Sequence, residues 1–466
     1  MMQAPSPLGA SAETSLSRGA RAPLWRAGGP IVATGALTPH RLETGRLVAT
    51  SSDLAPNQAA IAAECAGHTL YNAVATDRVV AQALQCLVNL DTVLRAAGSN
   101  TSRVVLLRIF LRHAHDRPAV ARAIRAWFGD SIPAGEIVIT GNQGCDPAQL
   151  LHLDALAAPI SSPWTPRPGV AMELRAITDP FPTQITYGPY VFTSGMPGVL
   201  DATGRLPTTQ TDLPAPERAL LREIGDIPAG ILPFLLQQAA MWALGRQVLA
   251  AAGTTAERIF HHLAWLGVNM RELANGSITR RVTPLVGDYA LTCFPVFGFH
   301  RPGSLIEGRF AALLPDLGVD KTARVPLHGI SNSYVGAIEV GSLVFGAGEV
   351  PVDTAARRLV TQPGDDASHA YAAFGLVAPQ AATAVQAAYI YDLIGKTLAA
   401  HGLSPAEVLQ QTLYLADVAD QAVVELMAHS FFGAAGPPPT AIAPILGASP
   451  FPQTRLEIEF VAAGRG

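Results

Sequence analysis

The sequence predicts an α+β fold built from three tandem copies of one domain, and three observations support this prediction. A helix–glycine–strand motif recurs three times along the 466 residues. A short apolar strand precedes each motif and another apolar strand closes each copy, always in the same order. Hydrophobic residues make up 49% of the chain and charged residues only 15%, so each copy has enough apolar material for its own core.

The helix–glycine–strand motif sets the period of the repeat. Its copies read AAGSNTSRVVLLRIFL (96–111), AAGTTAERIFHHLAWL (251–266) and AHGLSPAEVLQQTLYL (400–415). Stacked without a gap, their glycines coincide at Gly98, Gly253 and Gly402. Such a glycine suits the end of an amphipathic helix, and the apolar run after it has the length of a strand. The period is about 150 residues, far longer than that of a solenoid, so each copy is a whole domain.

Two further landmarks complete each copy. Turn glycines followed by apolar strands occur at 44–54, 187–198 and 340–351, and closing strands occur at 150–159, 304–313 and 454–463. Each copy is therefore expected to run hairpin, long helix, strand, shorter helix and two closing strands, with its helices on one face of the sheet. The other faces can cover one another, which predicts an intramolecular pseudo-trimer with sheets inside and helices outside.

These landmarks also give the expected boundaries. We predict a disordered tail over 1–24 and three domains over 25–160, 161–318 and 319–466. Insertions at 206–230 and 361–381 fall between the hairpin and the long helix of the second and third copies. They are expected to be lids or interface arms, or else surface packing loops.

Composition argues against several classes of partner. The formal net charge of -4 gives no electrostatic footprint for nucleic acid. Four cysteines without CxxC spacing indicate a reducing, cytoplasmic location, and neither a metal site nor a cofactor is predicted. No uninterrupted apolar run of about 18 residues occurs, so no membrane span is expected. The expected partner is a small-molecule substrate, and the expected assembly is a monomeric pseudo-trimer or a homodimer of it.

The third copy carries a family resemblance between about residues 331 and 463. Its segments SYVGAIEVGSLVFGAGEVPVD (333–353), LSPAEVLQQTLYLADVADQAVVELMAHSFFG and LEIEFVAA resemble the Rid/YjgF superfamily, the RidA-like enamine/imine deaminases. The second copy is similar at YVFTSGMPGVLDATGRL (190–206), and the first copy is the most diverged. The resemblance implies a chorismate-mutase-like fold, a trimeric assembly and small-molecule sites in the clefts between copies.

The resemblance also implies an arginine before a closing strand, which holds a substrate carboxylate in the deaminases. A guanidinium suits this role because it can donate two parallel hydrogen bonds to a carboxylate. The matching positions here hold Gly135, Leu291 and Pro439. The arginine is missing in all three copies, so classical deamination of 2-aminoacrylate-type substrates is not expected.

Other family positions survive in part. The family cysteine position holds Ile137, Cys293 and Ala441. The family tyrosine near the hairpin is Tyr334 in the third copy and Phe181 in the second. The resemblance implies that Cys293 contacts substrate and that Tyr334 belongs to the catalytic group. It further implies that the hairpin turns bind substrate through backbone N–H groups, at Ser194, Gly195 and Gly348.

Ionisable residues recur two positions apart on the closing strands, and residues two apart in a strand face the same side. The pairs are His152/Asp154, Glu307/Arg309 and Glu457/Glu459. Two carboxylates on one face repel, which tends to raise one pKa toward acid–base use. Glu459, at the position of the family's water-orienting acid, is the predicted acid or base, with Glu457 beside it; His152, Asp154 and Arg309 are predicted substrate contacts. The alternative is that these pairs are exposed strand-face charges or salt bridges between domains.

Three functional hypotheses follow. The first is a small-molecule enzyme of specialised metabolism that performs hydrolysis, deamination, tautomerisation or cyclisation in an inter-domain cleft without the arginine. The second is a chorismatase-like hydrolase or lyase, because LEIEF resembles the VEIEG-like closing run of those enzymes. The third is a non-catalytic ligand-binding or scaffold protein, which the loss of the arginine from every copy favours.

Overall fold

The computed structural model describes residues 23–66, 73–141, 146–169, 174–225, 227–267, 276–299, 301–325, 335–353, 356, 358–361, 380–447 and 453–464. Within them the chain is an α+β protein whose strands form three large sheets, as the sequence predicts. Most of the predicted tail and most of the predicted insertion at 361–381 lie outside the described residues. In the described part of the chain, no helix is long and apolar enough to cross a membrane.

The first repeat forms one five-stranded sheet in the order β1-β2-β5-β3-β4. Its elements are β1 (Trp25–Gly28), β2 (Ile31–Thr34), α1 (Pro56–Ala66), α2 (Ala73–Ala96), β3 (Val104–Leu111), α3 (Arg117–Phe128), β4 (Ala134–Ile139) and β5 (Leu151–Ala157). Strands β3 and β4 pair in parallel through the crossover helix α3, and the other pairs are antiparallel.

The second repeat has the same core order, β11-β10-β12-β8-β7, with β6 added at one edge. Its elements are β6 (Arg167–Gly169), α4 (Arg175–Thr178), β7 (Gln184–Tyr187), β8 (Tyr190–Thr193), β9 (Met196–Pro197), α5 (Ala215–Arg222), α6 (Leu232–Ala251), β10 (Ile259–Leu266), α7 (Gly276–Val286), β11 (Ala290–Pro295) and β12 (Ile306–Leu313). Helix α5 lies within the predicted insertion at 206–230 and packs against α6 and α7.

The third repeat follows the same plan, with the sheet order β13-β14-β15-β20-β18-β19. Its elements are β13 (Lys321–Val325), β14 (Ala337–Val340), β15 (Leu343–Gly346), β16 (Val352–Asp353), β17 (Arg358–Leu359), α9 (Gln380–Ala400), β18 (Val408–Leu415), α10 (Gln421–Phe432), β19 (Thr440–Pro444) and β20 (Leu456–Ala463). Strands β16 and β17 form a separate two-stranded ribbon.

The hairpin of the first repeat is not where its landmark predicts it. Residues 51–53 of the predicted hairpin segment 44–54 form a short 3₁₀ helix, and the hairpin is β1–β2, with its turn at Gly29. The run GGPIVATGAL matches GPYVFTSGMP of the second repeat better than the segment at 44–54 does. Gly29, Gly188 and Gly341 occupy the three equivalent turns with φ of 54°, 54° and 61°, a backbone conformation that glycine adopts without a Cβ clash.

One glutamine on the long helix marks the repeat more clearly than any sequence landmark. The three residues are Gln82, Gln237 and Gln386, and all are nearly fully buried. In each, the side-chain amide donates to a carbonyl in the loop before the closing strand, at 2.9–3.0 Å, and its oxygen accepts an N–H two residues further on, at 2.7–2.8 Å. The glutamine therefore joins the long helix to the loop that leads into the closing strand.

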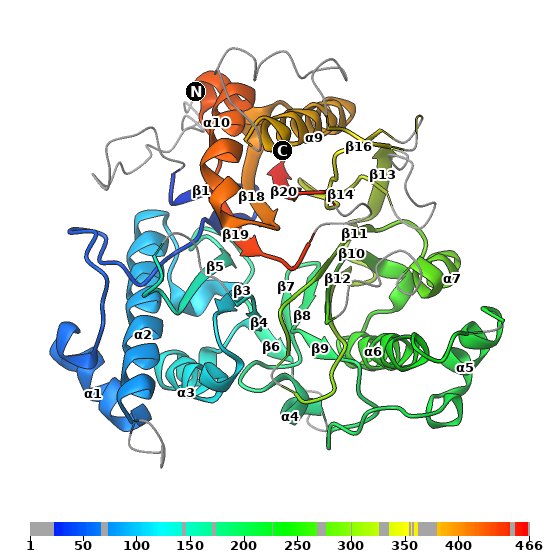
Figure 1. The fold of residues 1–466 in the computed structure, drawn as a ribbon, viewed down its shortest axis with the longest axis horizontal. Coiled ribbons are helices and arrows are strands. Elements are labelled where there is room, and N and C mark those ends of the chain that lie inside the picture. Colours follow the sequence, from blue (N-terminus) through cyan, green and yellow to red (C-terminus); the bar gives the residue numbers. More distant parts are fainter. Residues whose placement is uncertain are drawn as a thin grey trace.

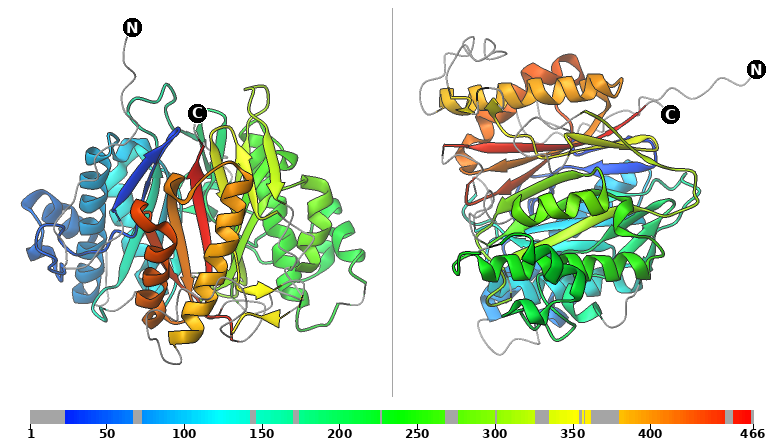
Figure 2. Two further views of the ribbon diagram at one scale, coloured as in Figure 1. Left: turned by 90° about the horizontal axis from the view of Figure 1, so that it is seen from above. Right: turned by 90° about the vertical axis from the view of Figure 1, so that its right-hand side faces the viewer.

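The three sheets face one another and the helices cover their outer faces (Figure 1). Figure 2 shows the same layering from two further directions, with the long helices on the outside. Strand β18 contacts β1 and β2, β3 and β4 contact β7 and β8, and β10 contacts β14, so each repeat touches both others. Two apolar clusters draw residues from all three sheets and form the centre of the molecule.

We expect Gln386→Ala to lower the free energy of unfolding by about 1–3 kcal/mol, because it removes a buried side chain and leaves a part-buried carbonyl and a part-buried N–H without their partner. Gln421→Ala, on the exposed side of α10, is the matched control and should change stability by no more than about 0.5 kcal/mol. Chemical unfolding followed by circular dichroism measures both. Equal losses in the two variants would contradict the linking role.

Candidate functional site

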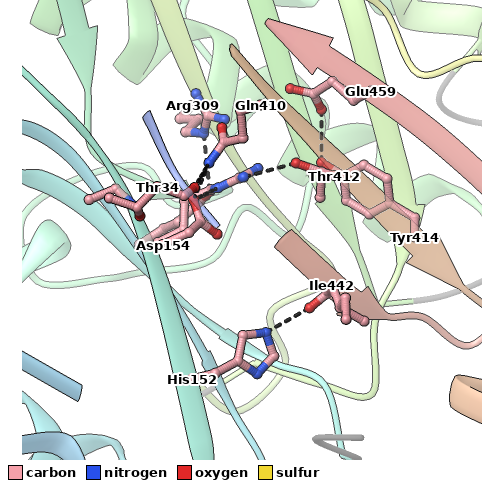
Figure 3. A network of polar contacts seen from close by, with 12 residues as sticks. Thr34, His152, Asp154, Arg309, Gln410, Thr412, Tyr414, Ile442 and Glu459 are labelled. Atoms are coloured by element: carbon pink, nitrogen blue, oxygen red, sulfur yellow. Dashed lines mark hydrogen bonds and ion pairs between the residues drawn. The ribbon is translucent and has the colours of Figure 1, made fainter. Parts of the chain in front are cut away.

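A layer of charged side chains lies between the two central apolar clusters, where the inner faces of the three sheets meet. Figure 3 labels Asp154, Arg309 and Glu459 of this layer. Its members are Arg108, Glu136, Asp154, His261, Arg309 and Glu459, and the exposed fraction of each is 5% or less. Asp154, Arg309 and Glu459 occupy equivalent positions on the closing strands of the three repeats, and Arg108, Glu136 and His261 lie on neighbouring strands. These side chains are therefore not exposed charges on a strand face. Two ion pairs, Glu136–Arg309 and His261–Glu459, are salt bridges between domains, which is the alternative that the sequence analysis gave for such charges.

Arg108 connects the first repeat to the third. Its Nε donates to Oδ1 of Asp154 at 2.8 Å within the first sheet, and its Nη2 donates to Oγ1 of Thr412 on β18 at 2.9 Å. Gln410, also on β18, donates to the backbone oxygen of Thr34 at 2.5 Å. Burial raises the pKa of Asp154, and the Arg108 guanidinium offsets part of that effect.

Glu136 connects the first repeat to the second. Its Oε1 accepts from Nε of Arg309 at 3.1 Å, and its Oε2 accepts from Nε1 of Trp265 at 2.8 Å. Both carboxylate oxygens are therefore occupied by donors from the second sheet. Glu136 therefore ties the first sheet to the second through both of its oxygens.

Glu459 connects the third repeat to the second. Its Oε2 accepts from the hydroxyl of Tyr414 at 2.8 Å, and its Oε1 lies 3.3 Å from Nε2 of His261. Burial by itself would raise the pKa of Glu459, but the charges of His261, Arg108 and Arg309 outweigh it and lower that pKa to about 2. Glu459 therefore stays ionised near neutral pH and holds the layer together.

The three junctions between repeats share one backbone contact. In each, the small-residue turn that follows the second strand of a hairpin, and not the hairpin turn itself, donates an N–H to a carbonyl at the start of the parallel edge strand of another repeat. The bonds run from Gly195 to Gly135 at 3.0 Å, from Ala36 to Thr440 at 2.9 Å and from Gly348 to Leu291 at 3.3 Å. We call these junctions 1–2, 3–1 and 2–3, after the repeats that they join. They place the predicted turn residues beside the positions where the family arginine was sought.

The strand register corrects one arginine position and one cysteine position, both in the third repeat. Gly135 pairs with Leu107 and Leu291 with His262, and the equivalent pairing in the third repeat is Gln411 with Thr440. The arginine position of the third repeat is therefore Thr440, one residue after the predicted Pro439. For the same reason its cysteine position is Ile442 and not Ala441. The short GPPPTAI segment offers no side chain that fixes the alignment, so the sequence alone left it one residue out.

Junction 1–2 contains a buried carboxyl group beside a glycine turn. The ring of Phe181 lies against Gly135, 2.6 Å from where a Cβ would be, so it occupies the space of the missing arginine. Ser194 accepts from the N–H of Gly135 at 3.0 Å. The carboxylate of Glu307 sits directly over Gly195, where any side chain would collide with it.

The pKa of Glu307 is shifted in the opposite direction to that of Glu459. Burial raises its pKa to about 7, although the charges of Arg117 and Arg301 offset part of the rise. Its carboxyl group can therefore be neutral or charged near physiological pH, which is the property of a general acid or base. Arg117 begins α3 of the first repeat, and Arg301 lies in the loop before β12 of the second.

Junction 2–3 has a second group of buried carboxyls. The carboxylate of Glu457 sits over Gly348, as Glu307 does over Gly195. Glu349 is 5% exposed, and among the described residues its Oε1 has no hydrogen-bond partner. Burial, reinforced by the charge of Glu457, raises the pKa of Glu349 to about 8. Cys293 is buried on β11 of this junction.

Junction 3–1 is closed by direct contacts. Nε2 of His152 lies 2.6 Å from the backbone oxygen of Ile442 (Figure 3). The His152 ring also stacks on the ring of Phe110, with 4.8 Å between the ring centroids. Burial lowers the pKa of His152 to about 4. The imidazole is thus neutral at pH 7 and already bound to protein on that side.

The structure distributes the predicted site residues over several places. Asp154, Arg309 and Glu459 share the central layer, whereas His152, Glu457 and the three turn residues lie at different junctions. Tyr334 lies outside the described residues. Within the described part of the chain, no three His, Cys, Asp or Glu side chains are placed to hold a metal ion.

Sequence reasoning missed Arg108, Glu136, Arg117, Arg301 and Glu349. Arg108 and Glu136 carried a usable signal, because each is a lone charge in an apolar strand. A strand buried on both faces can accept such a charge only if a partner meets it. Arg117 and Arg301 lie near loops and gave no such signal.

Comparisons with known proteins cover the repeats one at a time. The family model described as endoribonuclease L-PSP matches residues 34–142 and 328–464, together just over half of the chain. A putative endoribonuclease of Klebsiella pneumoniae is 20% identical, covers 29% of this chain and 97% of its own, and has a TM-score of 0.26. The yjgF gene product of E. coli is 18% identical, with coverages of 32% and 95% and a TM-score of 0.24. A putative endoribonuclease of Thermotoga maritima is 20% identical, with coverages of 31% and 95% and a TM-score of 0.23. None of the curated proteins matches the chain.

We expect Glu459→Gln to lower the free energy of unfolding at pH 7 by about 3–5 kcal/mol, because it removes one partner of a buried charged network. The loss should shrink as pH falls: the pKa of Glu459 is lowered in the folded state, so its stabilisation is present above its unfolded pKa and disappears toward pH 2. Thermal unfolding at several pH values measures this. Glu425→Gln, on the exposed side of α10, is the control, and equal behaviour of the two variants would contradict the assignment.

Proposed function

Because the chain belongs to the endoribonuclease L-PSP family, the Rid/YjgF proteins, we propose that it is a small-molecule enzyme whose acid–base group is Glu307. The observation that carries the proposal is the state of that carboxyl: it is buried at junction 1–2, over the turn glycine Gly195, with a pKa of about 7. A group with this pKa transfers protons efficiently at neutral pH. The reaction class proposed is proton transfer to or from an imine, enamine or enol.

Glu307 is a better candidate than the predicted Glu459. The pKa of Glu459 is about 2, and its oxygens face Tyr414 and His261, so it has no proton to give near neutral pH. We assign Glu459 a structural role: its contacts with His261 and Tyr414 stabilise the central layer. The predicted acid or base, Glu459, is the second residue of the closing-strand pair Glu457/Glu459. Glu307 is equivalent to Glu457, so the proposed acid–base group occupies the first position of such a pair, in the second repeat.

A second candidate place for the same chemistry is junction 2–3. Glu349 and Glu457 are both buried there, and the pKa of Glu349, at about 8, lies near neutrality. The observation that favours it is the Oε1 of Glu349, which has no hydrogen-bond partner among the described residues. The paired carboxyls and Cys293 make this junction the site to test next.

Two features restrict the reaction class and the substrate class that we propose. Because Phe181 fills the space beside Gly135, classical deamination of 2-aminoacrylate-type substrates stays outside the proposal. The net charge of -4 supports a small molecule over RNA as substrate, in spite of the family's description. A chorismatase-like reaction and a purely ligand-binding role are the alternatives that the experiment below separates.

We expect Glu307→Gln to reduce kcat by about 10²–10⁴-fold, because the amide keeps the shape and loses the proton. The substrates to screen are small imines, enamines and 2-oxo acids, followed by NMR for hydrolysis and for exchange of α-hydrogens with deuterium. If Glu307 acts as the acid, the wild-type rate should fall as pH rises through about 7, since ionisation removes the active neutral form.

The control for this variant is Glu223→Gln, which changes an exposed glutamate of the second repeat. Stability provides an independent readout. The pKa of Glu307 is raised in the folded state, so its stabilising effect is complete below its unfolded pKa and is lost as pH rises through about 7. Glu307→Gln should remove this pH dependence from the melting temperature. A variant with wild-type turnover and a wild-type pH profile would refute the catalytic assignment.

A further inference from the structure

A hydroxyl, an imidazole and a carboxylate form a hydrogen-bonded row within the first repeat. Oγ1 of Thr38 lies 3.0 Å from Nδ1 of His40, and Nε2 of the same imidazole lies 3.2 Å from Oδ2 of Asp146. All three residues are partly exposed, so small molecules in solution can reach them. We call these residues the Thr38 triad. The proposed function uses none of them.

The carboxylate sets the direction of both hydrogen bonds. A carboxylate only accepts hydrogen bonds, so Nε2 of His40 donates to Asp146. In a neutral imidazole the other ring nitrogen is then an acceptor, and Nδ1 accepts from the hydroxyl of Thr38. The hydroxyl proton therefore points at a base that a carboxylate orients. This is the arrangement of a hydrolase triad with the two ring nitrogens exchanged.

Further hydrogen bonds hold the segments that carry the triad. Nδ2 of Asn89, a buried residue of α2, donates to the backbone oxygens of Thr38 and His40, at 2.8 Å each. Oδ1 of Asp146, the oxygen that does not face the imidazole, accepts from the N–H of Ala148 at 2.8 Å. The imidazole and the carboxylate are thus oriented by the protein itself, which is what a nucleophile and its base require.

The fold does not need this triad, because the other two repeats form the same core sheet order without it. Counted from the turn glycines of the three hairpins, the positions of Thr38 and His40 hold apolar residues in the other repeats: Pro197 and Val199, and Val350 and Val352. None of these side chains can attack an acyl group or accept a proton. The triad belongs to the first repeat alone, and all its members lie within that repeat.

We propose that Thr38 is a nucleophile that accepts acyl groups from activated esters, with His40 as its general base and Asp146 as the residue that positions the imidazole. The hydroxyl oxygen attacks the carbonyl carbon of the ester, and its proton passes to Nδ1 of His40. The C–O bond to the leaving group then breaks, and the proton passes from Nδ1 to the departing oxygen. Water removes the acyl group from Thr38 by the same route, so the products are an alcohol, an acid and the restored hydroxyl.

The chemistry of the hydroxyl restricts the substrate. Threonine is a secondary alcohol, and the methyl group on its Cβ hinders attack on a bulky acyl group. The substrates should therefore be short acyl esters with a good leaving group, such as aryl esters. Glu307 has no part in this reaction, so the inference stands apart from the proposed function.

The test measures how fast the full-length protein releases p-nitrophenol from p-nitrophenyl acetate, with peptide mass spectrometry to locate the transferred acetyl group. The chain has two lysines, Lys321 and Lys396, so few amines compete for the label. Thr38→Val keeps the shape and lacks the hydroxyl, and it should lower the release rate and lose the label at that residue. Thr44→Val is the matched control and should behave as wild type, because Thr44 is exposed in the same segment and its Oγ1 accepts from the N–H of Arg46.

Variants of the other two members separate the triad from an ordinary surface hydroxyl. The Thr38-dependent rate is the difference between wild type and Thr38→Val. His40→Gln should lower this rate by about 10²–10⁴-fold, because the hydroxyl loses its base. Asp146→Asn should lower it as well, since an amide can donate to Nε2 and thereby leaves the ring proton on Nδ1, facing the hydroxyl. Asp146→Glu keeps the carboxylate and should recover part of the rate.

Two results overturn the inference. One is a release rate that Thr38→Val leaves unchanged, and the other is a Thr38-dependent rate that neither His40→Gln nor Asp146→Asn lowers. Melting temperatures and circular dichroism check that each variant is folded. Since Asp146 lies in a different segment from Thr38 and His40, a folding defect in one variant leaves another as an independent test.

Discussion

The arrangement of the three repeats depends on the burial of charges where their sheets meet. Arg108, Glu136, Arg309 and Glu459 are almost fully shielded from water, and each is paired across or beside a junction. An ion transferred into such an interior is stable only when a partner of opposite charge or a hydrogen bond meets it. Each sheet therefore needs the side chains of the other two, and the repeats fit together in one order.

This constraint accounts for the different side chains that the three repeats carry at equivalent strand positions on similar backbones. In an assembly of identical copies, the residue at Asp154 would meet two further copies of itself, and three buried like charges repel strongly. In this chain the same position holds Asp154, Arg309 and Glu459. Fusion into one chain permits different residues at equivalent positions, so the charges can complement each other. The backbone bonds from the three turns remain the same at every junction.

Fusion also makes the three junctions chemically different. At junction 3–1, His152 is bound to a backbone oxygen and stacked on Phe110, so it serves to fill the interface. At junctions 1–2 and 2–3, Glu307 and Glu457 stand over turn glycines, and the pKa values of Glu307 and Glu349 are raised to about 7 and about 8. Glu459, whose pKa is lowered, lies in the central layer, and Glu307 and Glu349, whose pKa values are raised, lie toward the turns. The surroundings of each glutamate, and not its residue type, therefore set the direction of its pKa shift.

The sequence by itself determined the repeat, the family and the order of elements in each copy, but it placed the hairpin of the first copy at 44–54 instead of at β1–β2. These features depend on local signals: apolar alternation in strands, a glycine that ends each long helix, and turn glycines with positive φ. It also determined that Glu307 and Arg309, or Glu457 and Glu459, share a face, because that follows from the period of a strand. Where no local signal existed, as in the GPPPTAI segment, the alignment was one residue out.

Only the tertiary structure decided which of those side chains meet and in what state of charge. Glu459 and Glu307 look alike in the sequence, yet the pKa of one is lowered to about 2 and that of the other is raised to about 7. The difference comes from residues far away in the chain: His261, Arg108 and Arg309 surround Glu459, whereas burial outweighs the arginine charges around Glu307. Electrostatic interactions depend on distance and shielding in space, and strand periodicity carries no information about either.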